Sequence, residues 1–378
     1  MKIVHLVFDK TDAISRKLAN TVDQLATEQI KLGYQVTLWE ISTNPNDDLQ
    51  QRTYKTILFH VKKYQWSVSD EILNAINELS SDAILHFHGG FIPIFFTVAF
   101  QLNKKNIPFV YTPHGTFNKK NIEEDGISKK VYFKLFENNL MKWASALHFE
   151  GEIETSFIDD VNIVNNPKLV IIPNGLTNES MLPMHKFNEL EEPVFAFFGK
   201  IELADGGLDI LLQGFSDYKQ KYNGKGLLWI IGDGPDKKEI YGLATHLGIH
   251  NFVTFKGNIF GIRKFELLNK VNALVKPSRF EYDPSIILEA ASSYVPAIVS
   301  KETNLASYIN TYHAGIVLQE NNPTNLAKAF LQCSKEIDDG NWEPKRRNAV
   351  KMVTEKFQWS TIAQLHINMY EKVLKQPT

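Results

Sequence analysis

Two glutamates eight positions apart, Glu281 and Glu289, have the residue type and spacing to bind a polar, anionic ligand. Glu281 falls in an expected loop, and Glu289 falls just inside an expected helix. Asp283 can cap that helix, and Pro284 suits its first position. The free N–H groups and the positive dipole of a helix start attract an anion such as a diphosphate. The Glu289 carboxylate could accept two hydrogen bonds from a vicinal diol such as a ribose. An ordinary helix start with one exposed glutamate is the alternative.

The segment around these glutamates resembles a motif of a known family. It is similar to the Glu-x7-Glu region of the family-four retaining glycosyltransferases, which typically reads Pro-Ser-x-x-Glu-Gly-Phe-Gly-x-x-x-x-Glu-Ala. Here residues 282–284 read Tyr-Asp-Pro in place of Gly-Phe-Gly, so the surface that meets the donor sugar is altered. Further family motifs occur in the family's order: Pro-His-Gly at 113–115, Ile-Pro-Asn-Gly at 172–175, Gly-Lys at 199–200 and Gly-Asp-Gly-Pro at 232–235. The resemblance therefore covers most of the chain.

The resemblance implies a role for individual residues. A nucleotide diphosphate sugar would bind mainly to the second half of the chain, with Glu289 on the ribose and Lys200 on the diphosphate. Glu281 would contact the donor sugar. His114 would steady the sugar and the acceptor as a neutral imidazole, although a lone histidine after a strand is commonly structural. The implied donor-side residues also include Gly199, Asp283, Ser285, Ile286, Arg279, Gly232 and Asn258, and the acceptor-side residues include His88, Gly89 and Thr116.

The positive charge around the expected diphosphate differs from the family pattern. Relatives read Lys-Gly-Leu-Asp where this chain reads Gly-Gly-Leu-Asp at 206–209, so one lysine is replaced by Gly206. Fixed positive groups can stabilise a leaving nucleotide without a metal, and each contributes about 3 kcal/mol. Arg279, Lys276 or helix dipoles could compensate for the missing charge, or turnover could be slow.

Metal and cofactor sites are not expected. His86 and His88 share one face of a strand at positions i and i+2, which invites a metal site, but no third ligand has suitable spacing. The Gly-Asp-Gly-Pro turn lacks the third glycine of a dinucleotide fingerprint, so an NAD site is not predicted. We therefore expect no metal and no cofactor, with the nucleotide sugar as a substrate.

Composition limits the classes of partner and compartment. The chain has 378 residues and a formal net charge of −2, which argues against nucleic acid as the main partner. Cys333 is the only cysteine, so no intramolecular disulfide can form and a reducing, cytoplasmic location is expected. A strand expected at 3–8 leaves no room for a signal peptide. The longest apolar run, 91–100, is shorter than the roughly 20 residues of a membrane span.

A basic and aromatic segment between Lys119 and Trp143 could rest on a membrane surface. Anionic lipid heads attract such segments, and acceptors of the relatives often lie at membranes, so peripheral contact at the inner membrane face is one hypothesis. The alternative is a core-facing helix with solvated lysines. The segment contains Lys119, Lys120, Lys129, Lys130, Lys134 and Lys142 interleaved with Tyr132, Phe133, Phe136 and Trp143.

Strand-like runs alternate with amphipathic segments along both halves, which predicts an α/β protein with two doubly wound parallel sheets. The resemblance implies the GT-B fold, in which a C-terminal helix crosses back to the first domain. We expect an acceptor-binding Rossmann-like domain at 1–176, a nucleotide-sugar-binding one at 177–356 and the returning helix at 357–378. Ligands of such sheets bind beyond the carboxyl ends of the strands.

These observations favour a retaining glycosyltransferase that moves a sugar from a UDP- or GDP-linked donor to the hydroxyl of a glycan or lipid-linked acceptor. Assembly of a surface polysaccharide or lipid-linked glycan is the expected setting. One alternative is a non-catalytic sugar-nucleotide-binding subunit, which the missing lysine would suit. A retaining glycoside hydrolase is a further alternative, but it needs two carboxylates about 5 Å apart, and a helix start separates Glu281 from Glu289.

Overall fold

The computed structural model describes residues 1–9, 13–44, 52–62, 66–117, 126–155, 169–176, 192–280 and 284–375. The predicted site residues Glu281 and Asp283 lie outside this described part, as do Lys119 and Lys120 of the basic segment. The chain divides into two compact units. Unit 1 contains Met1–Gly175 and Trp359–Thr378, and unit 2 contains Leu176–Gln358.

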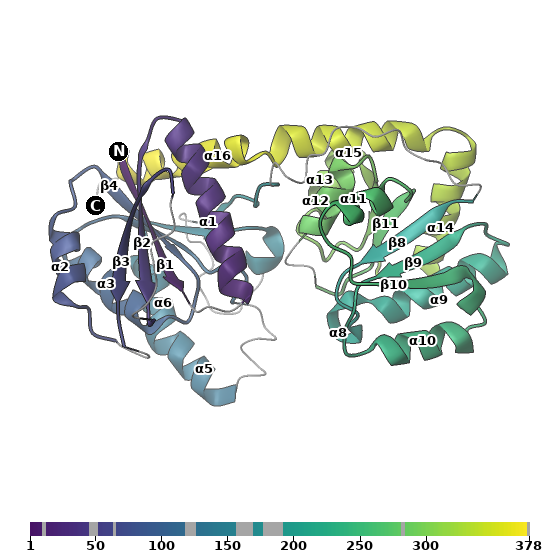
Figure 1. The fold of residues 1–378 in the computed structure, drawn as a ribbon, viewed down its shortest axis with the longest axis horizontal. Helices are drawn as coiled ribbons and strands as arrows, with labels where there is room; N and C mark the ends of the chain where they lie inside the picture. Colours follow the sequence, from purple (N-terminus) through teal and green to yellow (C-terminus); the bar gives the residue numbers. More distant parts are fainter. Residues whose placement is uncertain are drawn as a thin grey trace. The chain divides into compact units, whose positions relative to one another are not determined.

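Unit 1 is a parallel sheet with helices on both faces (Figure 1). The strand order is β3-β2-β1-β4-β5-β6-β7, so the chain reverses its direction of travel along the sheet between β1 and β4. The strands are β1 (Lys2–Asp9), β2 (Gln35–Ser42), β3 (Lys55–His60), β4 (Ala83–His88), β5 (Phe109–Thr112), β6 (Ala146–Phe149) and β7 (Leu169–Ile171). The helices are α1 (Ala13–Lys31), α2 (Asp70–Asn77), α3 (Pro93–Lys104), α5 (Gly126–Tyr132), the π-helical turn η1 (Phe133–Glu137), α6 (Asn138–Trp143) and α16 (Trp359–Lys375).

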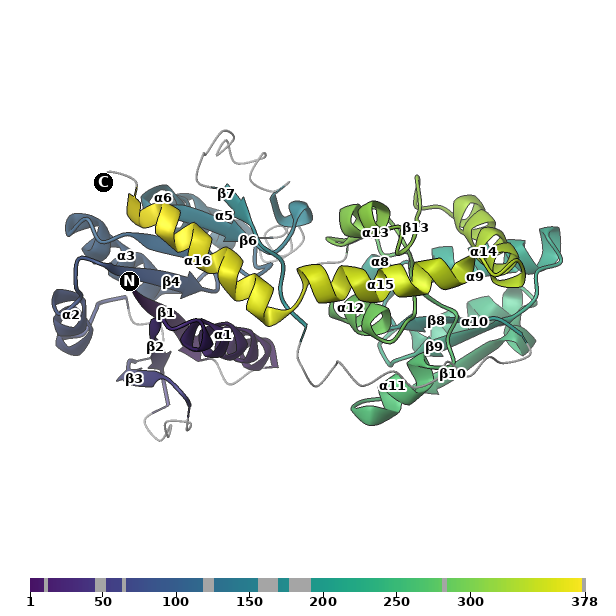
Figure 2. The same cartoon turned by 90° about the horizontal axis from the view of Figure 1, so that it is seen from above.

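Side chains along the central strands of unit 1 point alternately to the two faces of the sheet, and they pack into two separate hydrophobic cores. In β1, Val4 and Leu6 join the core that includes α3 and α6, whereas Ile3 and Val7 join the core that includes α1 and α16. Figure 2 shows α16 running beside α1 on that face of the sheet. The C-terminal helix therefore belongs to unit 1, as the GT-B resemblance implies.

Unit 2 repeats the same architecture with the strand order β10-β9-β8-β11-β12-β13, all parallel. Its strands are β8 (Val194–Phe198), β9 (Leu227–Ile231), β10 (Val253–Gly257), β11 (Ala273–Lys276), β12 (Ala297–Val299) and β13 (Gly315–Val317). Its helices are α8 (Leu203–Gly206), α9 (Leu208–Lys221), α10 (Lys237–His246), η3 (His250–Phe252), α11 (Ile262–Leu268), α12 (Ser285–Ser292), α13 (Ala306–Tyr312), α14 (Pro323–Asp338) and α15 (Trp342–Lys356). Phe195 and Phe197 of β8 pack on one face of this sheet, and Ala196 and Phe198 pack on the other.

The start of α12 differs from the sequence prediction. The helix begins at Ser285, and Pro284 occupies the N-cap position with no side-chain capping hydrogen bond. The Pro284 carbonyl accepts the first helical bonds, from the N–H groups of Ile287 and Leu288 at 2.9 and 3.1 Å. The prediction that Pro284 is the first residue of this helix is therefore wrong by one position, and the predicted cap Asp283 lies outside the described residues.

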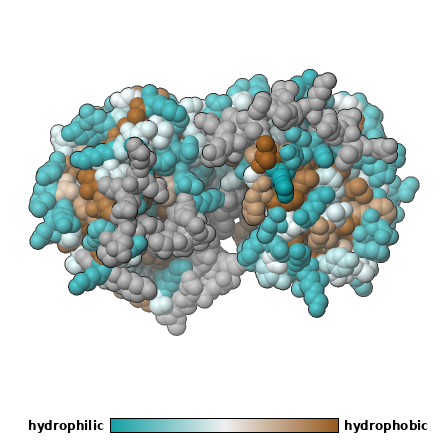
Figure 3. All heavy atoms as spheres, viewed as in Figure 1, coloured by the Kyte–Doolittle hydropathy of each residue, from teal (hydrophilic) through white to brown (hydrophobic). Residues whose placement is uncertain are grey.

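The aromatic residues of the basic segment face the interior of unit 1. Phe133 is buried, and the Phe136 ring lies 4.6 Å from the Trp66 ring and 5.1 Å from the Phe96 ring. This packing favours the core-facing interpretation over an aromatic membrane surface. In the described part of the chain, no helix is long and apolar enough to cross a membrane. On the face drawn in Figure 3, hydrophilic residues cover most of the described surface and hydrophobic residues form separate patches.

Candidate active site

A cavity of about 560 Å³ opens in unit 2 at the carboxyl ends of β8, β9, β10 and β11. This edge is where parallel α/β sheets bind ligands, because loops and helix starts converge there. The cavity gathers the predicted residues Gly199, Lys200, Gly232, Asn258, Ser285, Ile286 and Glu289. It is also lined by the exposed side chains of Phe260 and Phe280, which the sequence analysis did not predict.

The Glu289 carboxylate is already paired within this cavity. Its Oε2 atom lies 2.6 Å from Nζ of Lys264, a residue of α11. Both side chains are largely buried, with 15% of Glu289 and 21% of Lys264 exposed. A partly buried, charge-assisted contact of this kind fixes the carboxylate more firmly than a surface pair would. Lys264 therefore orients the group that we expected to bind a ribose.

Two further lysines bring positive charge to the cavity wall. Lys200 is exposed and pairs with Glu202 at 2.7 Å, a contact that contributes little because water screens it. Lys276 is buried at the end of β11, and its Nζ atom lies 4.8 Å from the centre of the Phe197 ring. Gly206 also lines the cavity and supplies no charge there.

Arg279 lies away from this cavity, contrary to the sequence prediction. Its guanidinium donates two hydrogen bonds to the Asp209 carboxylate, at 2.7 and 3.0 Å, and another to the Leu203 carbonyl. The hydrogen bond and charge of Asp209 raise the pKa of Arg279. These residues line a separate pocket beside His246. Arg279 holds α8 against α9 and is not placed to compensate for the missing lysine, whereas Lys276 is.

The glycines at the ends of β8 and β9 allow the two loops to touch. Gly232 has a φ of +143°, and a Cβ atom at this position would lie 1.8 Å from the Gly199 carbonyl oxygen. A Cβ atom on Gly234 would lie 2.2 Å from the Ile201 carbonyl oxygen. No side chain fits at either position, so the turn has the structural role expected for it.

The predicted acceptor-side residues gather at the carboxyl ends of β4 and β5 in unit 1. Gly89 donates its N–H to the Thr112 carbonyl at 2.9 Å, and the Thr116 hydroxyl donates to the Pro113 carbonyl at 2.8 Å. His114 adopts a left-handed φ of 53°, a conformation that costs free energy in a residue other than glycine.

Both ring nitrogens of His114 are hydrogen-bonded inside unit 1. Its Nε2 atom lies 3.0 Å from Nδ1 of His88, and its Nδ1 atom lies 2.5 Å from Oε1 of Glu150. Burial alone would raise the pKa of Glu150, but His114 and Asn174 outweigh it and lower this pKa to about 2. The ring can contact a substrate through nitrogen only if one of these partners is displaced.

Two family models match adjoining parts of the chain. The model described as Glycosyltransferase Family 4 matches residues 18–179, and the model described as Glycosyl transferases group 1 matches residues 184–350. The chain belongs to glycosyltransferase family 4.

Individual relatives of this glycosyltransferase agree with the family assignment. It is 28% identical over 238 residues to the uncharacterized glycosyltransferase MJ1607 of Methanocaldococcus jannaschii, covering 63% of this chain and only 53% of that relative. Its fold is similar to that of the lipopolysaccharide outer core galactosyltransferase WaaB, with a TM-score of 0.70, 15% identity and coverage of 98% and 99% of the two chains. HepE of Anabaena, solved in complex with UDP, has a TM-score of 0.65 at 16% identity, with coverage of 98% and 100%. These structures confirm the GT-B fold.

Sequence reasoning missed two charged residues of this glycosyltransferase. Lys264 lies on a helix that was expected, but nothing in its spacing indicated a partner 25 positions later. Glu150 comes directly after β6, which pairs with β5, the strand that precedes the Pro-His-Gly motif. Its position at the end of that neighbouring strand could have indicated it.

Proposed function

We propose that this glycosyltransferase uses a nucleotide diphosphate sugar, retains the configuration of the transferred sugar and needs no metal. The observation that supports this proposal most is the cavity of about 560 Å³ in unit 2. It combines one oriented carboxylate, Glu289, with three lysines, Lys200, Lys264 and Lys276. Glu202, Asp205 and Asp233 also line the cavity, and Lys200 pairs with Glu202. A diol acceptor next to lysine ammonium groups matches the ribose and diphosphate of such a donor.

In this proposal each group of the donor meets a complementary group of unit 2. The ribose hydroxyls donate to Glu289, and the base lies near Asn258. The diphosphate meets the lysines and the positive N-terminal end of α12. This fixed positive charge stabilises the leaving group as the bond breaks. Glu281, the predicted partner of the sugar hydroxyls, lies outside the described residues.

The reaction exchanges one bond to the anomeric carbon for another. The bond from that carbon to the diphosphate oxygen breaks, and a bond to the acceptor oxygen forms on the same face of the sugar. The departing phosphate oxygen takes the proton of the acceptor hydroxyl. The products are a nucleoside diphosphate and a glycoside of unchanged configuration. The lysines stabilise the negative charge that develops on the leaving group, which replaces the usual role of a metal ion.

The donor nucleotide, the acceptor class and the biological process are proposed from the names of similar structures. The UDP complex of HepE favours a UDP-linked sugar over a GDP-linked one. The activity named for WaaB favours a glycan or lipid-linked acceptor in surface polysaccharide assembly. A cytoplasmic protein with peripheral membrane contact would suit such an acceptor, and Val131 and Leu135 are exposed beside Lys130 and Lys134.

A second candidate function is a sugar-nucleotide-binding subunit that does not transfer. Gly206 favours it, because this position faces the cavity without the charge that its relatives place there. Such a subunit would bind the nucleotide but would lack enough stabilisation of the leaving group.

Turnover of the donor in EDTA tests the proposal. UDP-glucose and GDP-mannose are each incubated with the full chain and a glycan acceptor. Nucleoside diphosphate release is followed while NMR reports the anomeric configuration of the transferred sugar in the first product. We expect release of one nucleotide and a product of unchanged configuration. An inverted product, or turnover that EDTA abolishes and Mg²⁺ restores, would contradict the mechanism. Binding without any release would favour the second candidate.

A further inference from the structure

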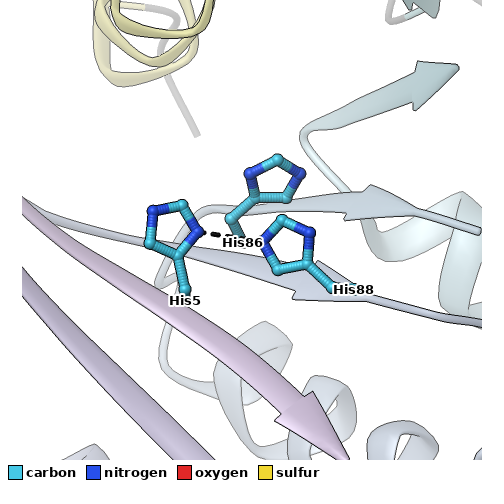
Figure 4. Close-up of side chains that lie close together, drawn as sticks. All are labelled: His5, His86 and His88. Carbon is cyan, nitrogen blue, oxygen red and sulfur yellow. Dashed lines mark hydrogen bonds between the residues drawn. The ribbon is translucent and has the colours of Figure 1, made fainter. Parts of the chain in front are cut away.

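A group of buried histidines lies between the sheet of unit 1 and the helices α1 and α16. His5 on β1 and His86 and His88 on β4 point to the same side of the sheet, and Figure 4 shows their rings gathered there. One ring nitrogen from each of the three lies within 4.8 Å of the other two, which resembles the spacing of a metal site. The sequence argument that no third ligand has suitable spacing was therefore wrong, because the pairing of β1 with β4 brings His5 beside the other two.

Hydrogen bonds account for all six ring nitrogens of these three histidines. His86 bonds to Tyr370 and Thr112, each at 2.6 Å. His5 bonds to Gln29 at 2.8 Å and to His88 at 2.9 Å, and His88 continues to His114. A metal would have to break several of these bonds. The arrangement is instead a continuous chain of hydrogen bonds, whose direction can be determined from its ends.

The donor and acceptor in each hydrogen bond can be assigned starting from the Ile172 carbonyl, which can only accept. His148 Nε2 therefore donates to it, at 2.8 Å. Burial lowers the pKa of His148 to about 4, so the ring is neutral and its Nδ1 atom accepts from the Thr112 hydroxyl at 2.7 Å. Thr112 has used its one proton, so its oxygen accepts from His86 Nε2.

The same reasoning fixes the orientation of the Gln29 amide. Burial lowers the pKa of His86 well below its usual value, so this ring carries one proton and its Nδ1 atom accepts from the Tyr370 hydroxyl. The Tyr370 oxygen can then only accept. Burial raises the pKa of Tyr370 and the Gln29 amide partly offsets this, as an N–H group beside the phenol oxygen would, although Gln29 Nε2 completes no full hydrogen bond. Gln29 therefore turns its oxygen toward His5.

From Gln29 the same assignment of donors and acceptors extends through His5 and His88 to the carboxyl edge of the sheet. His5 Nε2 donates to the Gln29 oxygen, so His5 Nδ1 accepts from His88 Nε2. Burial lowers the pKa of His5 to about 4 and that of His88 well below its usual value, so each ring has a single proton. His88 Nδ1 must then accept, and His114 Nε2 donates to it.

We infer that this directed chain and the Glu150 carboxylate together hold His114 as an imidazolium ion. Its Nε2 proton is committed to His88, and its Nδ1 atom faces an ionised carboxylate that can only accept a hydrogen bond. Both nitrogens therefore carry protons. Gln29, His5 and His88 act as positioning residues that determine this charge from inside the unit.

Three other titratable groups of this cluster are neutral beside the pair of His114 and Glu150. Burial lowers the pKa of His148 and His366, and both are neutral. Burial and the charge of Glu150 raise the pKa of Glu154 to about 8, so this carboxyl is protonated at neutral pH. The result is one ion pair at the carboxyl end of β5.

This inference changes the role expected for His114. A ring that already carries two protons, both donated internally, cannot accept the proton of an acceptor hydroxyl. His114 instead supplies a fixed charge and holds the Pro-His-Gly loop in its left-handed turn. The charge assignment is independent of the proposed function, and only its consequence for transfer rests on that proposal.

Nitrogen-15 NMR of the full chain with labelled histidine tests the inference directly. The His114 signals, assigned by their loss in His114→Gln, should show two protonated ring nitrogens at pH 7.5. His5, His86, His88 and His148 should each show protonation at Nε2 alone. A His114 ring with one unprotonated nitrogen would overturn the inference, whether or not the protein transfers a sugar.

Two variants test whether the chain sets this charge. Gln29→Leu removes the acceptor for His5, so the His5 and His88 protons can reverse and His114 should lose one proton at pH 7.5, although Gln29 does not touch it. Gln364→Leu is the control, because Gln364 lies on the exposed face of α16. Glu150→Gln removes the carboxylate and should also leave His114 with one proton. Two protonated nitrogens in Gln29→Leu would overturn the proposed role of the chain, and two in Glu150→Gln would overturn that of the carboxylate.

Discussion

Restoring a positive charge at position 206 should strengthen nucleotide binding. Gly206 lines the cavity of unit 2, and a Cβ atom there would meet nothing closer than 3.8 Å, at the Phe197 ring. Its φ is not left-handed, so a side chain is tolerated. We therefore expect Gly206→Lys to fold normally and to direct its ammonium group along the wall of the cavity.

The size of the effect follows from Coulomb's law. An ammonium about 6 Å from one phosphate charge contributes about 0.7 kcal/mol at the dielectric constant of water and about 2.8 kcal/mol at an effective value near 20. Since 1.4 kcal/mol is tenfold in affinity, the dissociation constant of UDP should fall by about 3- to 100-fold. The gain should shrink as salt is raised, because salt screens an exposed charge.

Calorimetric titration of UDP against the wild type, Gly206→Lys and Gly206→Met measures this gain. The methionine variant is the matched control, because it adds a side chain of similar length without charge and removes the same glycine. We expect tighter binding for the lysine variant alone, with a salt dependence steeper than that of the wild type. Equal affinities for the lysine and methionine variants would refute the reasoning that this wall faces the diphosphate.

Three further changes test other parts of the structure. Lys264→Met leaves the partly buried Glu289 carboxylate without its partner, so UDP should bind about tenfold more weakly in calorimetry, whereas unchanged affinity would mean that Lys264 does not orient it. Glu154→Gln should raise the melting temperature at pH 8.5 but not at pH 4.5. Burial and a neighbouring carboxylate raise the folded pKa to about 8, so the folded state holds a proton that the unfolded state releases, and wild-type stability falls between pH 4.5 and 8. Gly232→Ala should lower stability by about 3 kcal/mol in urea, since its Cβ atom would lie 1.8 Å from a carbonyl oxygen, while Gly242→Ala, with open space and a helical position, should be neutral or stabilising. Similar losses for the two alanine variants would contradict this account of the loop.

Much of the fold can be predicted from the sequence, because buried parallel strands appear as short apolar runs and their covering helices as amphipathic segments. Apart from the short helices α8 and η3, the strands and helices between Val194 and Val299 were expected within a few residues of their observed bounds. The helices α13, α14 and α15 were not expected. The three-residue strand β13 between α13 and α14 was also not expected. No strand separates α14 from α15, and the mean polarity of α15 hides its buried face.

The site could be predicted only where its residues follow a strand or open a helix. Lys200, Gly232 and Glu289 were found in this way, and they meet in one cavity. Arg279 was wrongly predicted to bind the donor, because the sequence does not show that its guanidinium lies within hydrogen-bonding distance of Asp209. Contacts between residues far apart in the chain were also hidden, and His5 and His88 are 83 positions apart. Parallel pairing of β1 with β4 brings those two together.

The central claim is that unit 2 binds a nucleoside diphosphate through Glu289. Calorimetric titration of UDP, GDP and ADP in EDTA, against the wild type and Glu289→Ala, tests it most directly. The account predicts that one nucleotide binds tightly to the wild type without metal and at least tenfold more weakly to Glu289→Ala. Binding of none of the three, or equal binding to both proteins, would contradict it.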